Sequence, residues 1–438
     1  MGAQSRPRIV IVGGGFAGYH AARRLCRMRT GAEIVLVNAT DYFLYLPLLP
    51  QVAGGVLDPR RVAVPLLAKL PGVRLVLGEV DEVDTDRREV GYVDPEGTRG
   101  RVRYDRLVIA AGAVHKLLPI PGIAEHAHGF RGLPEALYLR DHLIRQIELA
   151  GATDNPHECV ARCTFVVVGA GYTGTEVAAH GQLLTRAMTR RHPRLHGIRT
   201  RWLLLDIAPR PLPELDERLG RAAARVLSRR GVELRMETSV AEATAGGVRL
   251  SDGEFVPSQT LIWCVGVRPD PLVESLHLPT RKGRLVVDEY LRVPDRPEIF
   301  ACGDAAAAPV LDRPGEVSPM TAQHAVRQGK VVATNLAASI GRGRFRPYHH
   351  RELGFVVDLG GVQAAANPMG RVLSGPLAAA VTQGFHLWSI PGNRLRIAAD
   401  WLLSGVQPRQ VVQLGLVGSP QVPLDTASPE VVARARSG

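Results

Sequence analysis

Residues 8–18 read RIVIVGGGFAG, and this stretch decides the fold. The run Arg8–Val12 is short and rich in β-branched residues, which predicts a buried β-strand. A helix is expected from Phe16 to about Met28, and Glu33–Asn38 predicts the next strand. Strand, helix and strand in this order form a βαβ unit, so the chain is predicted to open with a doubly wound parallel sheet of the α/β class.

The glycine turn between that strand and that helix fits the pattern G-x-G-x-x-G at Gly13, Gly15 and Gly18. Gly13 permits a tight turn, Gly15 lets the backbone approach a pyrophosphate, and Gly18 lets the helix pack closely on the strand. Phosphates then rest on the helix N-terminus, where free N–H groups and the helix dipole favour anions. We predict a dinucleotide-binding turn that includes Phe16 and Ala17. The alternative is an ordinary glycine-rich turn.

A second turn of the same kind occupies Gly169, Gly171 and Gly174. It follows the apolar run Thr164–Val168 and precedes a helix expected at 173–191. The chain therefore repeats one arrangement of strand, glycine turn and helix. Because one dinucleotide cannot fill both turns, FAD in one and NAD(P)H in the other is the economical interpretation.

The residues that end the two following strands differ. Where an acid for the ribose is expected, the first unit has Asn38, whose neutral amide should hold a ribose hydroxyl more weakly than a carboxylate does. The second unit has Asp206, which favours the ribose diol of NADH over a 2′-phosphate. Arg210 lies nearby in the sequence and leaves NADPH open, and Asp206 also fits a simple role in capping the strand end.

These patterns predict two Rossmann-like dinucleotide-binding domains followed by a C-terminal region. The FAD-binding domain is expected to be discontinuous, at 1–115 and 287–340, with the NAD(P)H-binding domain inserted at 155–286. A connecting segment is expected at 116–154, and the C-terminal region at 341–438.

Several local patterns complete this outline. Residues 42–55 are interpreted as a loop with apolar and aromatic content, and 73–104 as a small antiparallel insertion. Residues 106–111 and 298–304 predict buried strands, and 321–338 predict a helix.

With both turns identified, the chain resembles the two-dinucleotide flavoproteins, the pyridine nucleotide-disulfide oxidoreductase-like superfamily. Residues 106–112 resemble its link strand, and Cys302-Gly303-Asp304 resembles its second FAD signature. Within it, the chain is similar to the type II NADH:quinone oxidoreductases, the single-subunit, non-pumping NADH dehydrogenases. Four stretches carry the similarity: FLYLPLLPQVA at 43–53, TGTE at 173–176, AQHAVRQG at 322–329, and residues 386–401.

The resemblance implies a catalytic role for two residues. Glu176 would face the nicotinamide and the flavin and help to couple proton movement, and Gln323 would line the flavin and the quinone mouth. Charge–dipole stabilisation of a helix by Glu176, worth about 0.3–1 kcal/mol, is an equally simple explanation from the sequence alone. Gln323 also fits a plain surface amide, and the adjacent His324 is more simply a packed histidine than an acid or base.

The resemblance also implies the remaining ligand contacts, with FAD bound non-covalently, a quinone as acceptor and no metal. The residues assigned to FAD are Gly13, Gly15, Phe16, Ala17, Gly18, Asn38, Val80, Ala111, Gly112, Asp304, Ala322 and Gln323. Those assigned to NADH are Gly169, Gly171, Tyr172, Gly174, Glu176, Asp206 and Gly266. Leu48 and Gln323 are assigned to the quinone.

Composition narrows the partners. The net charge of +12 suits anionic partners, but no dense Lys/Arg run is interleaved with aromatics, so nucleic acid is not expected. The five cysteines form no Cys-x-x-Cys motif, so a disulfide framework or a dithiol reductase is not expected. No stretch offers eighteen consecutive apolar residues, so no transmembrane helix is expected.

The C-terminal region combines apolar stretches with arginines. Arg394, Arg396 and Trp401 are expected to anchor it at lipid head groups, which predicts a peripheral protein on the cytoplasmic face of the cell membrane. A homodimer interface or a lid over the flavin domain are the alternatives.

The predicted activity is transfer of hydride from NADH to FAD and then of two electrons to a membrane quinone, without proton pumping. One rival is a soluble NAD(P)H-dependent reductase of a small electron-transfer protein. Another is an NADH-responsive regulatory flavoprotein.

Overall fold

The computed structural model describes residues 6–351 and 353–424, and the chain divides into two units. Unit 1 comprises Met1–Leu44, Ala63–Val114 and Val267–Arg351. Unit 2 comprises Tyr45–Val62, His115–Gly266 and Glu352–Gly438.

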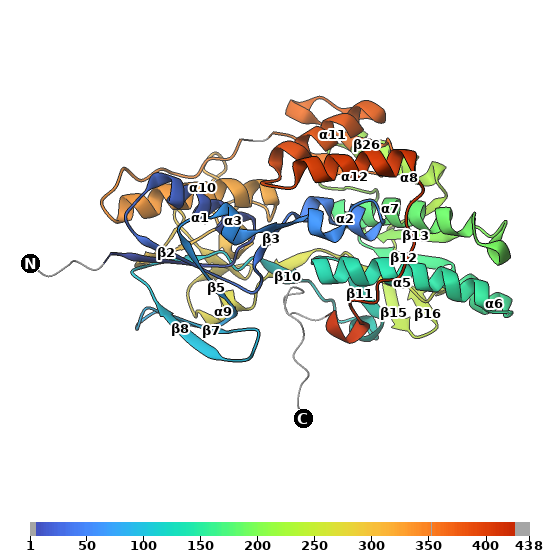
Figure 1. Ribbon diagram of the computed structural model, residues 1–438, viewed down its shortest axis with the longest axis horizontal. Helices are drawn as coiled ribbons and strands as arrows, with labels where there is room; N and C mark the ends of the chain where they lie inside the picture. The colour runs from blue at the N-terminus through green and yellow to red at the C-terminus, as the bar shows by residue number, and fades with distance from the viewer. Residues whose placement is uncertain (1–5, 352, 425–438) are drawn as a thin grey trace, which may run out of the picture. The chain divides into compact units, whose positions relative to one another are not determined.

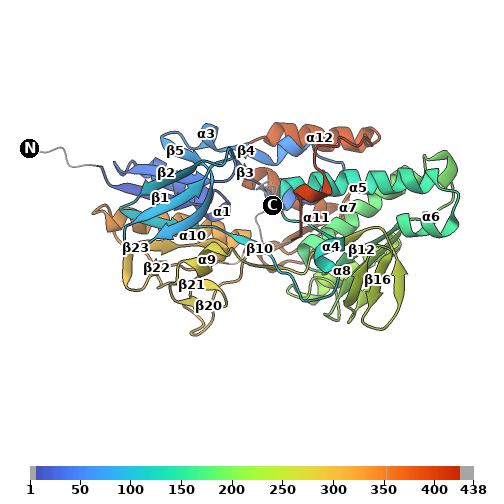
Figure 2. The same ribbon diagram turned by 90° about the horizontal axis from the view of Figure 1, so that it is seen from below.

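Unit 1 is built on a six-stranded sheet in the order β22-β23-β9-β1-β2-β5. Its strands are parallel except for β22, which pairs antiparallel with β23. Figure 2 shows this sheet with α1 (Phe16–Met28) and α10 (Ala322–Ser339) beside it. The strand bounds are β1 (Arg8–Val12), β2 (Glu33–Asn38), β5 (Val73–Leu77), β9 (Arg106–Ile109), β22 (Arg292–Val293) and β23 (Arg296–Ala301).

The two long helices of unit 1 cross closely. Figure 1 shows α1 and α10 side by side. A Cβ at Gly329 would collide with the main-chain oxygen of Ala17, so only glycine permits this approach. The predicted opening of strand, helix and strand and the predicted helix near 321–338 are confirmed.

Smaller elements complete unit 1. The predicted antiparallel insertion is confirmed in part, because β6, β7 and β8 form an antiparallel sheet while β5 joins the parallel one. The bounds are β3 (Tyr42–Leu44), β4 (Ala63–Pro65), α3 (Leu66–Lys69), β6 (Glu79–Asp84), β7 (Glu89–Val93), β8 (Arg99–Arg103), β10 (Ala113–His115, at the border of the unit), β19 (Val267–Pro269), α9 (Leu272–Ser275), β20 (Thr280–Arg281), β21 (Arg284–Val286) and β24 (Ala306–Ala307).

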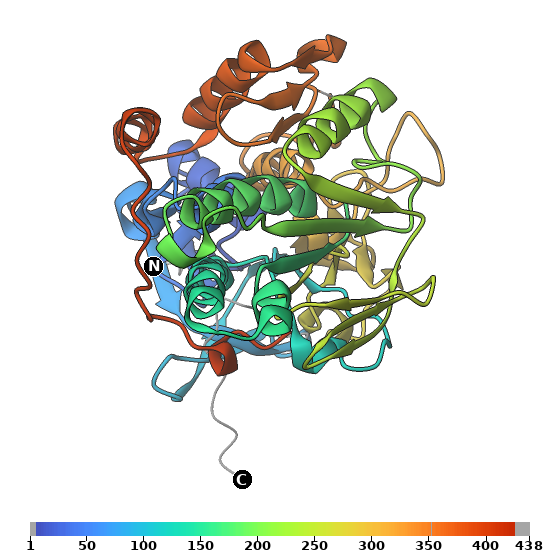
Figure 3. The ribbon, with the colours of Figure 1, turned by 90° about the vertical axis from the view of Figure 1, so that its right-hand side faces the viewer.

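Unit 2 is built on a five-stranded sheet in the order β11-β18-β12-β13-β14, with every pair parallel. Figure 3 looks onto this unit, where the neighbouring helices α5 and α7 run beside the sheet. The bounds are α4 (Ile123–His126), β11 (Ala127–Gly129), α5 (Leu133–Ala152), α6 (Pro156–Arg162), β12 (Thr164–Val168), α7 (Tyr172–Thr189), β13 (Arg201–Asp206), α8 (Glu217–Arg229), β14 (Val232–Met236) and β18 (Leu261–Trp263). Both parallel sheets confirm the predicted α/β class.

The C-terminal residues add a second layer to unit 2. Helix α11 packs on the antiparallel sheet β25-β26-β27, and that sheet in turn contacts α8. The bounds are α2 (Leu49–Ala53), β15 (Val240–Thr244), β16 (Gly247–Leu250), β17 (Phe255–Pro257), β25 (Val356–Asp358), β26 (Ala364–Ala366), β27 (Leu373–Ser374), α11 (Pro376–Ser389) and α12 (Arg394–Val406).

Four of the predicted borders differ from the observed units. The inserted domain was expected to end at 286, but 267–286 belong to unit 1. Residues 45–62 belong to unit 2, not to the unit that holds the first glycine turn, because α2 packs on α5 and α7. The expected connecting segment, 116–154, is also part of unit 2, since it supplies α5 and β11. The expected separate C-terminal region is divided: 341–351 stay with unit 1, and the rest joins unit 2.

The interpretation of 42–55 as a loop was wrong. Residues Tyr42–Leu44 form β3, Leu46–Leu48 form a 3₁₀ turn, and Leu49–Ala53 form α2. The prolines misled the prediction, because Pro47 and Pro50 stand at the first turns of short helices, where proline is tolerated. Among the described residues, no helix combines the length and apolarity that crossing a membrane requires.

Candidate nucleotide-binding sites

The first glycine turn has the geometry that its sequence predicts. Gly13 has φ of +95°, and a Cβ there would collide with the main-chain oxygen of Ala110. A Cβ on Gly18 would collide with the main-chain oxygen of Gly13, which explains the close contact of helix and strand. At Gly15, by contrast, a Cβ would meet no described atom within 4 Å. The turn is therefore closed on the protein side and open where a pyrophosphate is expected.

The second glycine turn repeats this geometry in unit 2. Gly169 has φ of +99° and lies against the main-chain oxygen of Cys264, and Gly174 lies against that of Gly169. A Cβ on Gly171 would meet no described atom within 4 Å. Gly171 precedes α7 with φ of −70° and ψ of −165°, and Gly15 precedes α1 with φ of −68° and the same ψ.

The two strand-end residues hold their turns in the same way. Asn38 Oδ1 accepts the Gly14 N–H at 2.7 Å, and Asp206 Oδ2 accepts the Ala170 N–H at 2.6 Å. Asn38 also donates through Nδ2 to the main-chain oxygen of Thr40 at 2.8 Å. Asp206 therefore does cap the turn, as the simpler explanation expects. Its carboxylate still has lone pairs that can accept from a further donor.

A second cluster of unit 1 surrounds Asp304, which lies in the 3₁₀ turn Gly303–Ala305. The Gly303 N–H donates to Gln328 Oε1 at 2.7 Å, and Gln328 Nε2 donates to Ser318 Oγ at 2.9 Å. Arg284 is 6% exposed and donates through Nη1 to the main-chain oxygen of Ser318 at 2.7 Å.

Arg284 is the residue of this cluster that the sequence did not reveal. Its Nε and Nη2 groups are buried and find no hydrogen-bond partner among the described residues. Burial lowers the pKa of its guanidinium, and the carboxylate of Asp304 opposes that shift. A buried cation with orphan donors is costly unless an acceptor completes it, so the site suits an anionic or oxygen-rich ligand.

Ala322 and Gln323 open α10 in unit 1. Arg327, one turn later, donates to both the main-chain oxygen and the Oε1 of Gln323 at 3.2 Å. Oε1 is therefore an acceptor, and Nε2 is the donor of this amide. His324 is buried, and its Nδ1 lies 2.7 Å from the hydroxyl of Tyr348, which supports the packed role expected for it.

Glu176 lies in a buried polar network of unit 2. It is the fifth residue of α7, beyond the first turn, and 9% exposed, so stabilisation of the helix dipole at the surface does not explain it. Its Oε1 accepts the main-chain N–H of Asp358 at 2.8 Å. Burial raises the pKa of Glu176 well above its ordinary value, and the carboxylate of Asp358 adds to the shift.

Asp358 is the charged member of this network. His180 Nε2 lies 3.1 Å from its Oδ2, Gln51 Nε2 donates to the same atom at 2.6 Å, and the Gly360 N–H donates to Oδ1 at 2.8 Å. Burial opposes ionisation, but His180 and these donors hold the pKa of Asp358 below its usual range. The network therefore shifts the pKa values of two neighbouring carboxyl groups in opposite directions, upward for Glu176 and downward for Asp358.

The network joins segments that are far apart in sequence. Gln51 lies in the stretch 43–53 that carries the family resemblance, but no local pattern singled out Gln51, His180 or Asp358. Trp401 Nε1 donates to Gln51 Oε1 at 2.6 Å, so this indole is engaged inside unit 2 and is not available as the expected head-group anchor. Trp388, at 71% exposure, is the exposed tryptophan of the C-terminal helices.

The other predicted contacts lie on these same units. In unit 1, Phe16 is half-buried and Ala17 buried at the start of α1, Val80 is half-buried in β6, and Ala111 and Gly112 follow β9. In unit 2, Tyr172 begins α7, and Gly266 has φ of +93° with open space at its Cβ position. Leu48 is fully buried, while the neighbouring Leu46 is 37% exposed.

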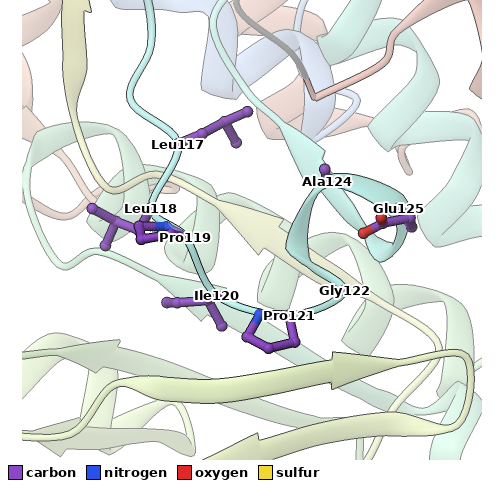
Figure 4. A pocket seen from close by; sticks show the side chains of 8 residues that line it. All are labelled: Leu117, Leu118, Pro119, Ile120, Pro121, Gly122, Ala124 and Glu125. Atoms are coloured by element: carbon purple, nitrogen blue, oxygen red, sulfur yellow. The ribbon is translucent and has the colours of Figure 1, made fainter.

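Unit 2 also has a shallow hollow of about 390 Å³. Figure 4 shows its lining, which comes from one continuous segment and includes none of the predicted contacts: Leu117, Leu118, Pro119, Ile120, Pro121, Gly122, Ala124 and Glu125. Within the described ranges, no three His, Cys, Asp or Glu side chains are grouped to hold a metal ion.

Comparison with known proteins matches residues 7–329 to the pyridine nucleotide-disulphide oxidoreductase family. The type II NADH:quinone oxidoreductase NdhA of Mycobacterium tuberculosis is 31% identical, over 90% of this chain and 86% of its own length. The demethylphylloquinone reductase NdbB of Synechocystis is 31% identical, over 91% of this chain and 96% of its own. The structure of NDH2 from Plasmodium falciparum in complex with NADH covers 93% of this chain and 100% of its own, with a TM-score of 0.87 at 16% identity, a likeness of fold alone.

Proposed function

The chain belongs to the pyridine nucleotide-disulphide oxidoreductase family and, within it, to the type II NADH:quinone oxidoreductases, and on that premise we propose that it oxidises NADH and reduces a membrane quinone without pumping protons. The observation that carries the proposal is the repeated glycine turn, open at Gly15 and at Gly171. Two such turns suit two different dinucleotides in one chain.

Unit 1 is the proposed FAD-binding unit. Its turn at Gly13–Gly18 would receive the pyrophosphate, and Asn38 would meet the ribose. Asp304 and the orphan donors of Arg284 would receive further oxygen atoms of the cofactor. Bound non-covalently, FAD supplies the capacity to take a hydride from NADH and to release two electrons to a quinone.

Unit 2 is the proposed NADH-binding unit. Its turn at Gly169–Gly174 would receive the pyrophosphate, and the carboxylate of Asp206 would accept from the ribose diol while it repels a 2′-phosphate. Tyr172 and Gly266 would border the nucleotide. NADH is therefore preferred to NADPH in this proposal.

Glu176 is the proposed proton-holding residue. Quinone reduction consumes protons, and a carboxyl group that stays neutral near pH 7 can donate one. Burial and the neighbouring Asp358 carboxylate raise the pKa of Glu176 and so favour its protonated form, while the hydrogen bond from the Asp358 N–H opposes this shift.

The acceptor side of the proposal rests on Gln323 and on the segment that contains Leu48. The Nε2 of Gln323 is oriented as a donor by Arg327 and suits a quinone carbonyl. Exposed apolar side chains on α11 and α12 suit a peripheral position on a membrane: Leu377, Trp388, Leu395, Leu402, Leu403 and Val406. We also propose that the protein lies on the cytoplasmic face of the membrane and that it can form a homodimer.

The test is spectroscopic and uses the purified full chain. We expect bound flavin, rapid anaerobic bleaching by NADH, slower bleaching by NADPH, and reoxidation by a ubiquinone or menaquinone analogue. Protein that neither carries flavin nor takes it up on reconstitution would contradict the proposal. Bleaching by NADH without reoxidation by any quinone, but with reoxidation by a ferredoxin, would favour a soluble reductase instead.

A further inference from the structure

The outer surface of α1 and α10 in unit 1 carries a cluster of cations, of which Arg327 contacts the predicted site residue Gln323. We call it the α1–α10 cationic face, and it consists of Arg23, Arg24, Arg27, Arg327 and Lys330. Arg24, Arg27 and Lys330 are exposed, while Arg23 and Arg327 are half-buried. Arg24 on α1 reaches Thr334 on α10 with an Nε–Oγ1 distance of 3.0 Å, so the two helices contribute to one continuous surface.

The cations of this face lie close enough to repel one another. Partial desolvation, then repulsion from Arg327 and the three α1 arginines, lowers the pKa of Lys330. Burial, then repulsion from Lys330 and two of the same arginines, lowers the pKa of His20 to about 3, so His20 adds no charge near neutral pH.

Carboxylates do not balance the face. Neither α1 nor α10 contains an Asp or Glu, and in the described ranges none of the five cations forms an ion pair. The hairpin β7–β8 of the same unit shows the usual arrangement, since Arg99, Arg101 and Arg103 pair with acids on β6 and β7.

This arrangement does not favour the folded state. Like charges one helical turn apart, as at Arg23 and Arg27, destabilise a helix slightly, where an acid at either position would stabilise it. Only Arg27, in the last turn of α1, gains from the helix dipole. Folding therefore does not explain why five cations gather here.

We infer that the α1–α10 cationic face binds the anionic head groups of a phospholipid membrane. The face spans two helices that contact each other through Arg24 and Thr334, which suits many head groups better than a single small anion. Arginine and lysine stems can lie along a surface while their charges reach outward. Tyr19, the aromatic residue beside the cluster, is buried and offers no stacking platform for single-stranded nucleic acid.

The inference is tested with the full chain and vesicles of phosphatidylcholine with and without phosphatidylglycerol. R23Q/R27Q/K330Q removes three unpaired cations and leaves Arg327, which contacts Gln323, intact. R99Q/R101Q/R103Q removes the same charge from paired positions in the same unit. Co-sedimentation should show affinity for anionic vesicles falling roughly fivefold per cation removed in the first variant, from about 1 kcal/mol per cation near such a surface.

The control variant should keep most of that affinity, and both variants should bind neutral vesicles like wild type. The melting temperature of the first variant should be unchanged or raised, because the variant removes repulsion between like charges. A loss of vesicle binding in this variant then cannot come from unfolding. Turnover of NADH with a water-soluble quinone analogue should be unchanged in both, which separates this inference from the proposed activity.

Three results would overturn the inference. Equal losses in both variants would indicate net charge alone. Unchanged vesicle binding in the first variant would exclude the face. Unchanged vesicle binding with lost affinity for inorganic pyrophosphate or a DNA duplex would assign the face to another anion.

Discussion

The two glycine turns share a backbone and differ in the residue that completes them. Each has a closed glycine with positive φ, an open glycine before the helix, and a side-chain oxygen from the next strand that accepts a main-chain N–H. That oxygen belongs to a neutral amide in unit 1 and to a carboxylate in unit 2. On the proposed assignment, the comparison teaches that the turn would select dinucleotides as a class, whereas the strand-end residue and the surrounding unit would select between them.

The largest expected effect is loss of a whole turn. In G18A or G174A, the new Cβ would collide with a main-chain oxygen that cannot rotate away, and overpacking of this kind costs roughly 1–3 kcal/mol or more. G18A should lose flavin and G174A should lose NADH binding, both with a lower melting temperature. Flavin absorbance and thermal unfolding measure this. A G18A protein with full flavin and an unchanged melting temperature would show that the turns are not equivalent in the way described.

A sharper test uses the open glycines. G15A and G171A place a Cβ where no described atom lies within 4 Å, so the fold should tolerate them. The methyl group would instead occupy the space for a pyrophosphate, so G15A should weaken FAD retention at least tenfold and G171A should raise KM for NADH similarly. Flavin titration and steady-state kinetics separate the two. If the cofactor losses were interchanged between the variants, the assignment of FAD to unit 1 and NADH to unit 2 would be wrong.

The contribution of Glu176 to the stability of unit 2 should depend on pH. A carboxyl group whose pKa is raised on folding binds more protons in the folded state, so its contribution to stability is present below about pH 4.5 and is lost as pH rises through the folded-state pKa. E176Q removes this loss, which amounts to about 1.4 kcal/mol of unfolding free energy for each tenfold rise in proton affinity on folding. The melting temperature of E176Q relative to wild type should therefore rise with pH, while quinone reduction slows and loses one limb of its pH profile.

Asp358 provides the opposite sign as a control. Its pKa is lowered on folding, so its contribution to stability is present above its ordinary pKa and is lost as pH falls through the folded-state value. D358N should thus lower the free energy of unfolding near neutral pH. A wild-type protein whose difference from E176Q did not vary with pH would indicate that Glu176 is already ionised.

The smallest expected effect comes from exchanging the strand-end residues. D206N makes the second turn resemble the first, and a neutral acceptor in place of a charged one should weaken NADH binding about fivefold, since the two kinds of hydrogen bond differ by roughly 1 kcal/mol. Loss of the carboxylate should also narrow the preference for NADH over NADPH. The ratio of kcat/KM for the two nucleotides measures this. N38D serves as the reverse exchange and should leave that ratio unchanged.

Much of this architecture follows from the sequence. Arg8–Val12, Gly13–Gly18 and the helix after them are a local pattern, so their strand, turn and helix are predictable without knowledge of the rest of the chain. The error at 42–55 arose because Pro47 and Pro50 are compatible with either a loop or the first turn of a helix. Packing of α2 on α5 and α7 decided between them.

By itself, the sequence determined the two nucleotide turns, because steric limits on glycine and the hydrogen bonds of a strand end act within a few residues. Only the tertiary structure decided which residues govern Glu176, since Asp358 reaches it from 182 residues away. Tertiary structure likewise left Arg284 buried with orphan donors and brought the cations of α1 and α10 together. Burial and long-range charge depend on which surfaces meet, and no local pattern encodes that.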